Sequence, residues 1–262
     1  MLRILLLDDN PNDRLLVIHE LQQAFAQVEV LAAIDQSELE EKLEENQFDL
    51  VITDYQLRWS NGLEVLAAVK TRYPDRPVIM FTDSGNEEVA VQGMKQGLSD
   101  YLPKRQPFHR LAIAVREAML KQQMQRDYTA AMSALKASEE QFRLAMEAAE
   151  LGFWDWDIAS DRITSSYHHA RLMGIAPATF DNTYAGFLAH VHPDDRPLVE
   201  YAIGQAMASP LGAQGSEYEA EFRVVWPDGS IHWLAGKGRV YASGGQPVRM
   251  IGIVRDTTDR RL

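Results

Sequence analysis

The sequence contains no cysteine, which excludes disulfides, thiolate metal sites and cysteinyl adduct chemistry. It has no apolar run of about 18 residues, the length that a membrane-spanning helix needs. Its start, "MLRILLLDDN", turns acidic too soon for a signal peptide. A formal net charge of -12 argues against a basic stripe for nucleic acid. We therefore expect a cytoplasmic protein that neither binds nucleic acid nor inserts into a membrane.

The 262 residues suffice for one large domain or two ordinary ones, and residues 1–105 alternate strand-like with helix-like segments. This alternation predicts a doubly wound α/β fold, with a five-stranded parallel sheet and helices on both faces. The expected strands are Leu2–Leu7, Val28–Ala33, Leu50–Thr53, Val78–Phe81 and Asp100–Leu102, and the expected helices are Asn12–Phe25, Ser37–Glu45, Gly62–Arg72 and Glu87–Gln96.

Polar residues follow four of these strands, at the sheet edge where functional groups gather in open parallel sheets. They are Asp8 and Asp9, Asp54, Thr82 and Lys104. Three carboxylates close together repel one another, and a hard cation such as Mg²⁺ would relieve the repulsion. A carboxylate such as Asp54 could then attack phosphorus as a nucleophile, with the hydroxyl and the ammonium holding the phosphoryl oxygens.

Residues 1–125 resemble the receiver domain of two-component response regulators. The motifs that carry the resemblance are "LLLDDNPNDR", "LVITDYQLRWSNGLEVL", "VIMFTDSGNEEVAVQGMKQG" and "SDYLPK". The resemblance implies a flavodoxin-like fold with Asp54 as phosphoacceptor. It further implies that Asp8 and Asp9 hold Mg²⁺ together with Asp54, and that Thr82, Lys104 and Tyr101 bind the phosphoryl group or switch with it.

Three residues depart from the receiver pattern. Arg58 and Arg105 stand where proline is common, and Asp83 stands next to Thr82, where a small residue is usual. The extra carboxylate could repel a phosphoryl group or change its hydrolysis. None of the three removes a reacting group, so we expect a working site, with a receiver-like domain that no longer takes phosphate as the alternative.

A long helical stretch, residues 109–150, contains no proline or glycine. From Met124 it carries apolar or small residues in alternating steps of four and three, which is the heptad seam of a coiled coil. An earlier apolar set does not keep this register, so a phase shift is expected near 119–124. An ordinary amphipathic helix on its own domain is the alternative, but the length favours a joint that forms a homodimer. The seam positions are Met124, Tyr128, Ala131, Leu135, Ser138, Phe142, Ala145 and Ala149, and the earlier set is Leu111, Val115 and Ala118.

The second half is rich in aromatic, β-like segments, among them "GFWDWDI", "YEAEFRVVW", "SIHWLAGKGRVYA" and "VRMIGIVRDT". "WPDGS" and "ASGGQP" predict hairpin turns, and residues 166–207 predict helices broken at "GIAP" and "HPDDRP". This pattern predicts an α+β domain with an antiparallel sheet. Residues 138–259 resemble a PAS domain of the PAS-3 type, in which "DTT" at 256–258 closes the last strand and leads on to an effector. Whether an effector follows Leu262 is left open.

The PAS-like half offers several ligand possibilities. A flavin photosensor of the light-oxygen-voltage type would need a cysteine. Haem would need an axial histidine, a small metabolite would need an apolar pocket, and a packed core without ligand is the reading we favour. The haem candidates are His168, His169, His190 and His192; Trp154, Trp156, Trp226 and Trp233 are expected to pack the core and sheet face, and His232 to point to solvent.

The sequence therefore predicts a signalling protein and not an enzyme. A sensor histidine kinase or a phosphotransfer protein would phosphorylate Asp54, and the helical joint would pass the change to the PAS domain. The rival reading makes the PAS domain a ligand sensor and the receiver a dimerisation scaffold.

Overall fold

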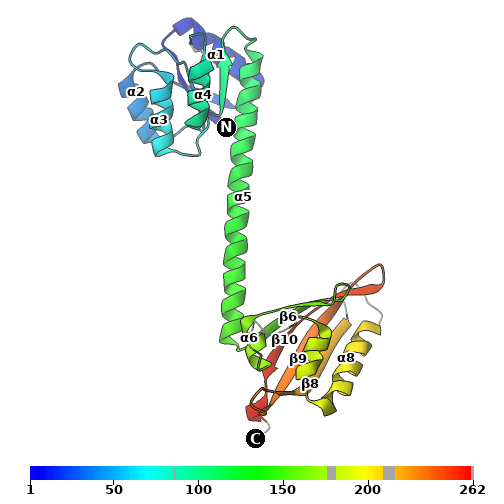
Figure 1. The fold of residues 1–262 in the computed structure, drawn as a ribbon. Coiled ribbons are helices and arrows are strands. Elements are labelled where there is room, and N and C mark those ends of the chain that lie inside the picture. Colours follow the sequence, from blue (N-terminus) through cyan, green and yellow to red (C-terminus); the bar gives the residue numbers. More distant parts are fainter. Residues whose placement is uncertain (85–86, 176–180, 209–215, 261–262) are drawn as a thin grey trace. The chain divides into compact units, whose positions relative to one another are not determined.

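The computed structural model describes residues 1–84, 87–175, 181–208 and 216–260 (Figure 1). The chain divides into two units, Met1–Ala134 and Leu135–Leu262. Part of the "GIAP" interruption lies outside the described residues. In the ranges above, no helix combines the length and the apolar character needed to cross a bilayer.

The first unit contains a five-stranded sheet in which every pairing is parallel, with strand order β2-β1-β3-β4-β5. The order reverses at β1, so the carboxyl ends of β1 and β3 lie side by side there. Strand β3 is buried at every residue, as expected for a strand covered on both faces. The strands are β1 (Leu2–Leu7), β2 (Val28–Ala33), β3 (Leu50–Thr53), β4 (Val78–Thr82) and β5 (Asp100–Pro103).

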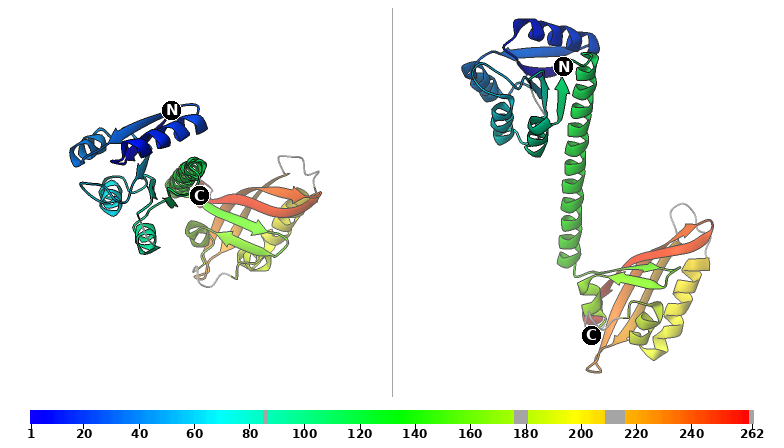
Figure 2. Two further views of the ribbon diagram at one scale, coloured as in Figure 1. Left: turned by 90° about the horizontal axis from the view of Figure 1, so that it is seen from above. Right: turned by 45° about the horizontal axis from the view of Figure 1, so that its top comes forward.

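Helices cover both faces of this sheet (Figure 2). Alternate residues of β1 point to opposite faces: Leu5 and Leu7 pack with α2 and α3, and Ile4 and Leu6 pack with α1 and α5. The predicted fold class is thus confirmed for this unit. The helices are α1 (Pro11–Ala24), α2 (Gln36–Glu45), α3 (Gly62–Arg72), α4 (Glu87–Lys95) and α5 (His109–Ala148), and the N-caps of the first three are Asn10, Asp35 and Asn61.

Helix α5 is continuous through the predicted phase shift. Leu111 and Val115 are fully buried in the first unit, and Gln122, farther along, is also buried. From Met124 to Ala145 the side chains are exposed, and Met124 and Tyr128 each keep 63% of their surface. The change of register therefore separates a face that packs on the core of the first unit from an exposed face of the same helix.

The second unit contains a five-stranded antiparallel sheet, order β7-β6-β10-β9-β8. Both predicted hairpin turns are present: Gly229 has a φ of +85° between β8 and β9, and Gly244 and Gly245 have positive φ values between β9 and β10. The short strand β7 was not named among the β-rich segments. The strands are β6 (Gly152–Asp157), β7 (Arg162–Ser165), β8 (Ser216–Val225), β9 (Ile231–Ser243) and β10 (Gln246–Asp256).

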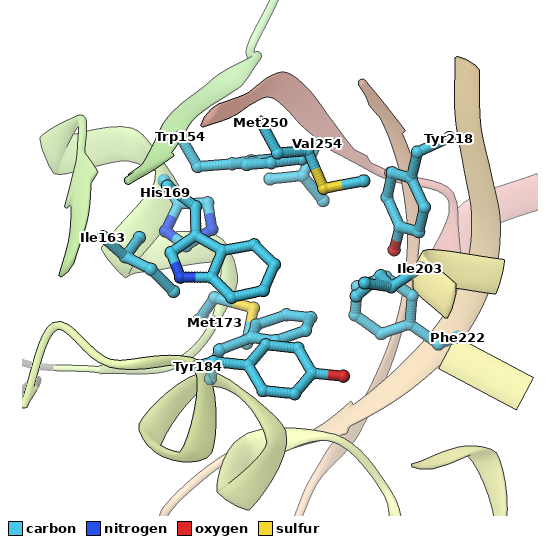
Figure 3. A pocket seen from close by; sticks show the side chains of 13 residues that line it. Trp154, Ile163, His169, Met173, Tyr184, Ile203, Tyr218, Phe222, Met250 and Val254 are labelled. Atoms are coloured by element: carbon cyan, nitrogen blue, oxygen red, sulfur yellow. The ribbon is translucent and has the colours of Figure 1, made fainter. Parts of the chain in front are cut away.

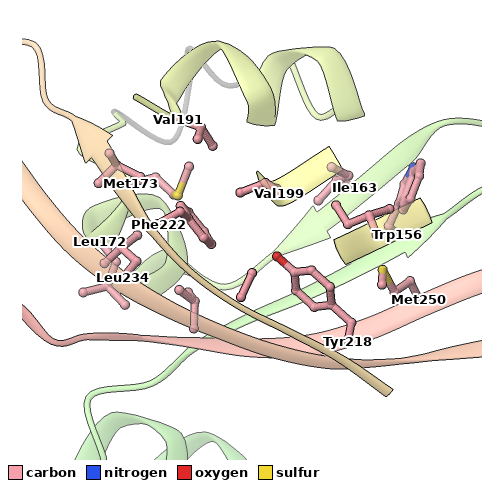
Figure 4. Packing of buried hydrophobic residues seen from close by; sticks show 14 of the residues in the cluster. Trp156, Ile163, Leu172, Met173, Val191, Val199, Tyr218, Phe222, Leu234 and Met250 are labelled. Atoms are coloured by element: carbon pink, nitrogen blue, oxygen red, sulfur yellow. The ribbon is translucent and has the colours of Figure 1, made fainter. Parts of the chain in front are cut away.

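One face of this sheet packs against helices, and Figure 4 shows the core between them. Val199 and Ile203 of α8 meet Phe222 and Leu234 from the sheet. Asp195 ties the start of α8 to β8, because its carboxylate accepts hydrogen bonds from the backbone and guanidinium of Arg223. The α+β class is confirmed here too. The helices are α6 (Tyr167–Leu172), α7 (Tyr184–His190), the 3-10 turn η1 (Pro193–Asp195), α8 (Arg196–Ala208) and η2 (Thr258–Arg260).

Candidate functional site

Asp54 lies directly after β3, and two groups from other elements hold its carboxylate. The Thr82 hydroxyl, at the end of β4, donates a 2.5 Å hydrogen bond to Oδ1 of Asp54. The backbone N–H of Gln56 donates to the same oxygen at 3.2 Å. The other oxygen, Oδ2, lies 2.7 Å from Nζ of Lys104. The structure thus brings together three residues that the sequence placed at separate strand ends.

Lys104 sits at the centre of this site, with its side chain only 6% exposed. Its Nζ lies 2.7 Å from one oxygen each of Asp8, Asp13 and Asp54. Burial alone would lower the pKa of Lys104, but the three carboxylates outweigh burial and hold the pKa above its ordinary value. The ammonium is therefore charged throughout the physiological range and balances much of the local negative charge.

Asp8 is almost completely buried, with 2% of its surface exposed. Burial raises the pKa of Asp8, and the negative charge of Asp54 adds to the rise, against the lowering effects of Lys104 and the N–H of Asn10. Removing a carboxylate from water disfavours its charged form, so Asp8 gains from any further cation at this edge.

Asp9 is turned toward the loop after β3. Its Oδ2 accepts a 2.7 Å hydrogen bond from the backbone N–H of Arg58 and lies 3.6 Å from the guanidinium Nε of that residue. The predicted magnesium ligands Asp8, Asp9 and Asp54 are all hard oxygen donors, which suits Mg²⁺. Among the described residues, however, no group of three such side chains is arranged to hold a metal ion. The ammonium of Lys104 and the N–H of Arg58 hold these carboxylates instead.

Tyr101 lies on β5 and is partly buried against the core beside α3 and α4. Burial raises its pKa, and the negative charges of Asp54 and Asp83 add to the rise. Asp83 itself is exposed.

The sequence analysis did not identify Asp13 as a residue of this site. Its position in the first turn of the helix after β1 was the available signal, since that turn starts beside the strand ends.

The second unit encloses a cavity of about 40 Å³ (Figure 3). Its lining is almost entirely apolar, with aromatic side chains from β6, α7 and β8 around His169 of α6. Pockets for drug-sized ligands occupy about 300–1,000 Å³. The cavity in this conformation therefore has no room for haem or flavin.

Trp154 fills much of the space beside this cavity. It lies in one row across the sheet with Gly252 of β10, Gly238 of β9 and Tyr218 of β8. A Cβ at Gly252 would come within 2.2 Å of the indole, and one at Gly238 within 2.7 Å. The indole thus lies over two glycines and meets Tyr218 edge-on, with ring centroids 5.9 Å apart.

The predicted histidines are spread over the second unit. His169 is 4% exposed and lines the cavity, and burial lowers its pKa to about 4. His168 is its neighbour on α6, His190 lies at the end of α7, and His192 caps η1 through a hydrogen bond from the N–H of Asp194. These four side chains do not gather at one site.

The prediction that His232 points to solvent was wrong. Its ring stacks on that of Trp226 with centroids 3.8 Å apart, and its side chain is 23% exposed. The Ser230 hydroxyl lies 3.0 Å from Nε2, and Asp256 lies 3.8 Å from Nδ1. Two residues that flank the tight β8–β9 turn thus pair their rings across it, which strand alternation alone does not reveal. The four tryptophans of this unit are not equivalent: Trp154 and Trp156 line the cavity, whereas Trp226 pairs with His232.

The chain thus combines a parallel α/β unit that carries clustered strand-end carboxylates with an antiparallel α+β unit. Two family models match it: that of the response regulator receiver domain at residues 4–116 and that of the PAS fold at residues 162–254. The chain therefore contains a receiver domain followed by a PAS domain, as its motifs predicted, and this combination supports a role in two-component signal transduction.

Curated relatives match part of the chain. It is 37% identical over 79 residues to the transcriptional regulatory protein ZraR of Klebsiella oxytoca, covering 30% of this chain and 18% of that protein. It is 32% identical over 117 residues to the response regulator protein PilR of Pseudomonas aeruginosa, covering 45% of this chain and 26% of that protein. The chain thus spans only a minor part of the length of these relatives.

Similar solved structures include the receiver domain of NtrX from Brucella abortus, at 30% identity and a TM-score of 0.41, covering 44% of this chain and 97% of that chain. A sensory box histidine kinase/response regulator from Burkholderia thailandensis matches at 30% identity and a TM-score of 0.39, covering 46% and 87%.

Proposed function

We propose that this protein is a phosphorylation-dependent switch in which Asp54 accepts a phosphoryl group and the receiver passes its state through α5 to the PAS domain. The observation that carries the proposal is the arrangement around Asp54: Thr82 donates to one carboxylate oxygen and Lys104 to the other. Asp54 is modified and later restored, so its role is switching and not turnover of a substrate.

The chemistry assigned to Asp54 is a displacement at phosphorus. An oxygen of Asp54 forms a bond to phosphorus while the bond from phosphorus to the donor breaks, and the leaving group keeps the electron pair and takes a proton from solvent. Thr82 and Lys104 then donate to oxygens of the transferred group. Mg²⁺, held by Asp8, Asp9 and Asp54, would neutralise the charge that develops on these oxygens.

We further propose that the phosphoryl donor is a sensor histidine kinase or a phosphotransfer protein, and that the chain acts as a homodimer through α5. The seam residues Met124, Tyr128 and Leu135 keep more than half of their surface exposed in the single chain. Such an apolar stripe at heptad spacing is what a second helix covers in a coiled coil. Phe142 also contacts Phe153 of its own PAS domain, with ring centroids 5.8 Å apart.

Phosphorylation is tested by intact mass after incubation with Mg²⁺ and a small phosphodonor. The wild type should gain one phosphoryl group, and Asp54→Asn should gain none. Asp49→Asn is the matched control, because this carboxylate precedes β3 and hydrogen-bonds the backbone N–H of Arg3. A wild type that gains no mass, under conditions that phosphorylate another receiver, would refute the proposal.

The relay is tested by deleting one residue of α5, Ala130, which is exposed. The deletion turns the following helix by about 100° and should uncouple the PAS domain from Asp54. Deleting seven residues, 128–134, keeps the heptad register and serves as the control. The readout is hydrogen exchange in β9 and β10 with and without phosphorylation. An unchanged response after the single deletion would contradict the relay.

The rival function, a PAS ligand sensor on a receiver scaffold, would need a larger cavity than about 40 Å³. A small molecule that co-purifies with the protein, together with signalling that is indifferent to Asp54→Asn, would favour it.

A further inference from the structure

Asp13 reaches the site from a different element than the other carboxylates. Asp8 and Asp54 follow strands, whereas Asp13 lies in the first turn of α1. Its Oδ2 lies 2.7 Å from Nζ of Lys104, and its side chain is 26% exposed. A lysine ammonium has three donors, and the three carboxylates take one each. In the described structure Lys104 therefore has no donor left for a phosphoryl oxygen.

An ordinary role for Asp13 would be to stabilise the N-terminus of α1, where carboxylates interact favourably with the helix dipole. First-turn carboxylates elsewhere in this unit bind neighbouring groups: Glu38 accepts from the N–H of Ile34, and Glu64 accepts from the Ser60 hydroxyl. Asp13 differs, because it is paired with a buried ammonium 91 residues away in the chain.

We propose that Asp13 is a positioning residue for phosphoryl transfer at Asp54, a role that rests on the proposed function. Asp13 keeps one N–H group of Lys104 in its own hydrogen bond. The N–H group that Lys104 now gives to Asp54 is then the one that can turn toward a phosphoryl oxygen. Asp13 also adds a fourth negative charge to those of Asp8, Asp9 and Asp54. This charge strengthens binding of the metal cation and weakens the approach of the anionic phosphodonor.

This role predicts opposite effects on two measurable steps. Replacing Asp13 by asparagine removes one negative charge, which weakens the attraction for Mg²⁺. The same change releases Lys104 toward the incoming phosphoryl oxygens and reduces repulsion of the donor, which speeds transfer at saturating Mg²⁺. General damage to the fold would weaken metal binding and slow transfer together, so the divergence identifies a positioning role.

The test compares wild type, Asp13→Asn and the first-turn control Glu64→Gln. Calorimetric titration of the unphosphorylated protein with Mg²⁺ should give a Kd raised about three- to tenfold in Asp13→Asn and unchanged in the control. Intact mass over time at saturating Mg²⁺ should give a transfer rate raised about threefold. In a Lys104→Met background the gain in rate from Asp13→Asn should shrink to the part that comes from reduced repulsion of the donor, because the release of Lys104 is no longer available.

Asp13→Glu keeps the charge and should restore Mg²⁺ affinity near that of the wild type, which also covers the case in which Asp13→Asn does not fold. If the wild type takes up a phosphoryl group while Asp13→Asn matches it in both Mg²⁺ affinity and rate, the inference is overturned and the proposed function stands. If the wild type takes up none, the proposed function falls, and this role falls with it.

Discussion

The side-chain amide of Gln122 donates a 2.9 Å hydrogen bond to the backbone carbonyl of Asp75, in the loop before β4. Gln122 is 7% exposed, although it lies on a helix whose next residues are all exposed. Beyond the fully buried Leu111 and Val115, it is the last buried residue of α5. The bond therefore marks the point up to which α5 is anchored to the receiver core.

Gln122→Ala should loosen this anchor at a cost of about 1 kcal/mol, the usual net value of a hydrogen bond whose partner can be solvated again. We expect faster amide hydrogen exchange in residues 118–126. The neighbouring Gln123→Ala removes only an exposed bond to Asp127 and serves as the control. Equal exchange in the two variants would mean that apolar packing alone anchors the helix.

The PAS domain should lose stability as the pH falls through the acidic range. The imidazole of His169 has a folded pKa of about 4, because burial disfavours its charged form, whereas an unfolded histidine titrates near pH 6.5. Between these values the unfolded chain binds the extra proton, so acid favours unfolding. This residue should cost about 2 kcal/mol between pH 7 and pH 5.

His169→Gln should therefore flatten the pH dependence of urea unfolding, followed by tryptophan fluorescence, whatever its effect on stability at pH 7. His19→Gln removes an exposed histidine of α1 and should leave the slope unchanged. A slope that survives in His169→Gln would assign the acid sensitivity to other groups.

Trp154→Ala should convert the small PAS cavity into a site for a flat aromatic molecule. Deleting a fully buried tryptophan costs about 3–5 kcal/mol, part of it for the cavity left behind, and the partly buried Trp154 should cost less. Free indole should bind there and raise the melting temperature of the variant in proportion to the logarithm of its concentration. Trp226→Ala removes a ring that lies outside the cavity and should gain nothing from indole. Stabilisation of the wild type by indole would show that the core opens without the substitution.

Lys104→Met should destabilise the metal-free receiver by about 3–5 kcal/mol, because Asp8, Asp13 and Asp54 lose their shared counterion. Mg²⁺ should restore more stability to this variant than to the wild type, since it supplies the missing positive charge. Thermal unfolding with and without Mg²⁺ measures both effects, and the exposed Lys121→Met is the control. If Mg²⁺ stabilises Lys104→Met no more than the wild type, the metal does not take over the role of the ammonium as counterion of these carboxylates.

The strand ends of the receiver were readable in advance, because the carboxyl ends of parallel strands must share an edge once the alternation is recognised. This rule led to Asp54, Thr82 and Lys104. The rule did not find Asp13, because Asp13 lies on a helix. The direction of a helical side chain depends on how the helix is rotated about its axis, and residue spacing does not say which neighbour that side chain contacts. The rule did not find the bond between Asp9 and the backbone of Arg58 either, since any residue except proline supplies that N–H.

In the PAS domain the strands and turns were predictable from alternation and glycine, apart from the short β7. The way in which side chains fill the core was not predictable from the sequence. Trp154 was expected to pack, but its extension over Gly252 and Gly238 depends on cross-strand register, which links residues about 85–100 positions apart. Register follows from the assembled sheet and not from any one segment.

The row of Trp154, Gly252, Gly238 and Tyr218 has a consequence for related sequences. Any side chain at either glycine would occupy the space of the indole, so the three positions should vary as a set. A relative with alanine or valine at position 238 or 252 should carry a smaller residue at position 154. A relative that loses the tryptophan but keeps both glycines should have an enlarged, open PAS core. These three positions would thus sort PAS domains into closed and ligand-accepting kinds from sequence alone.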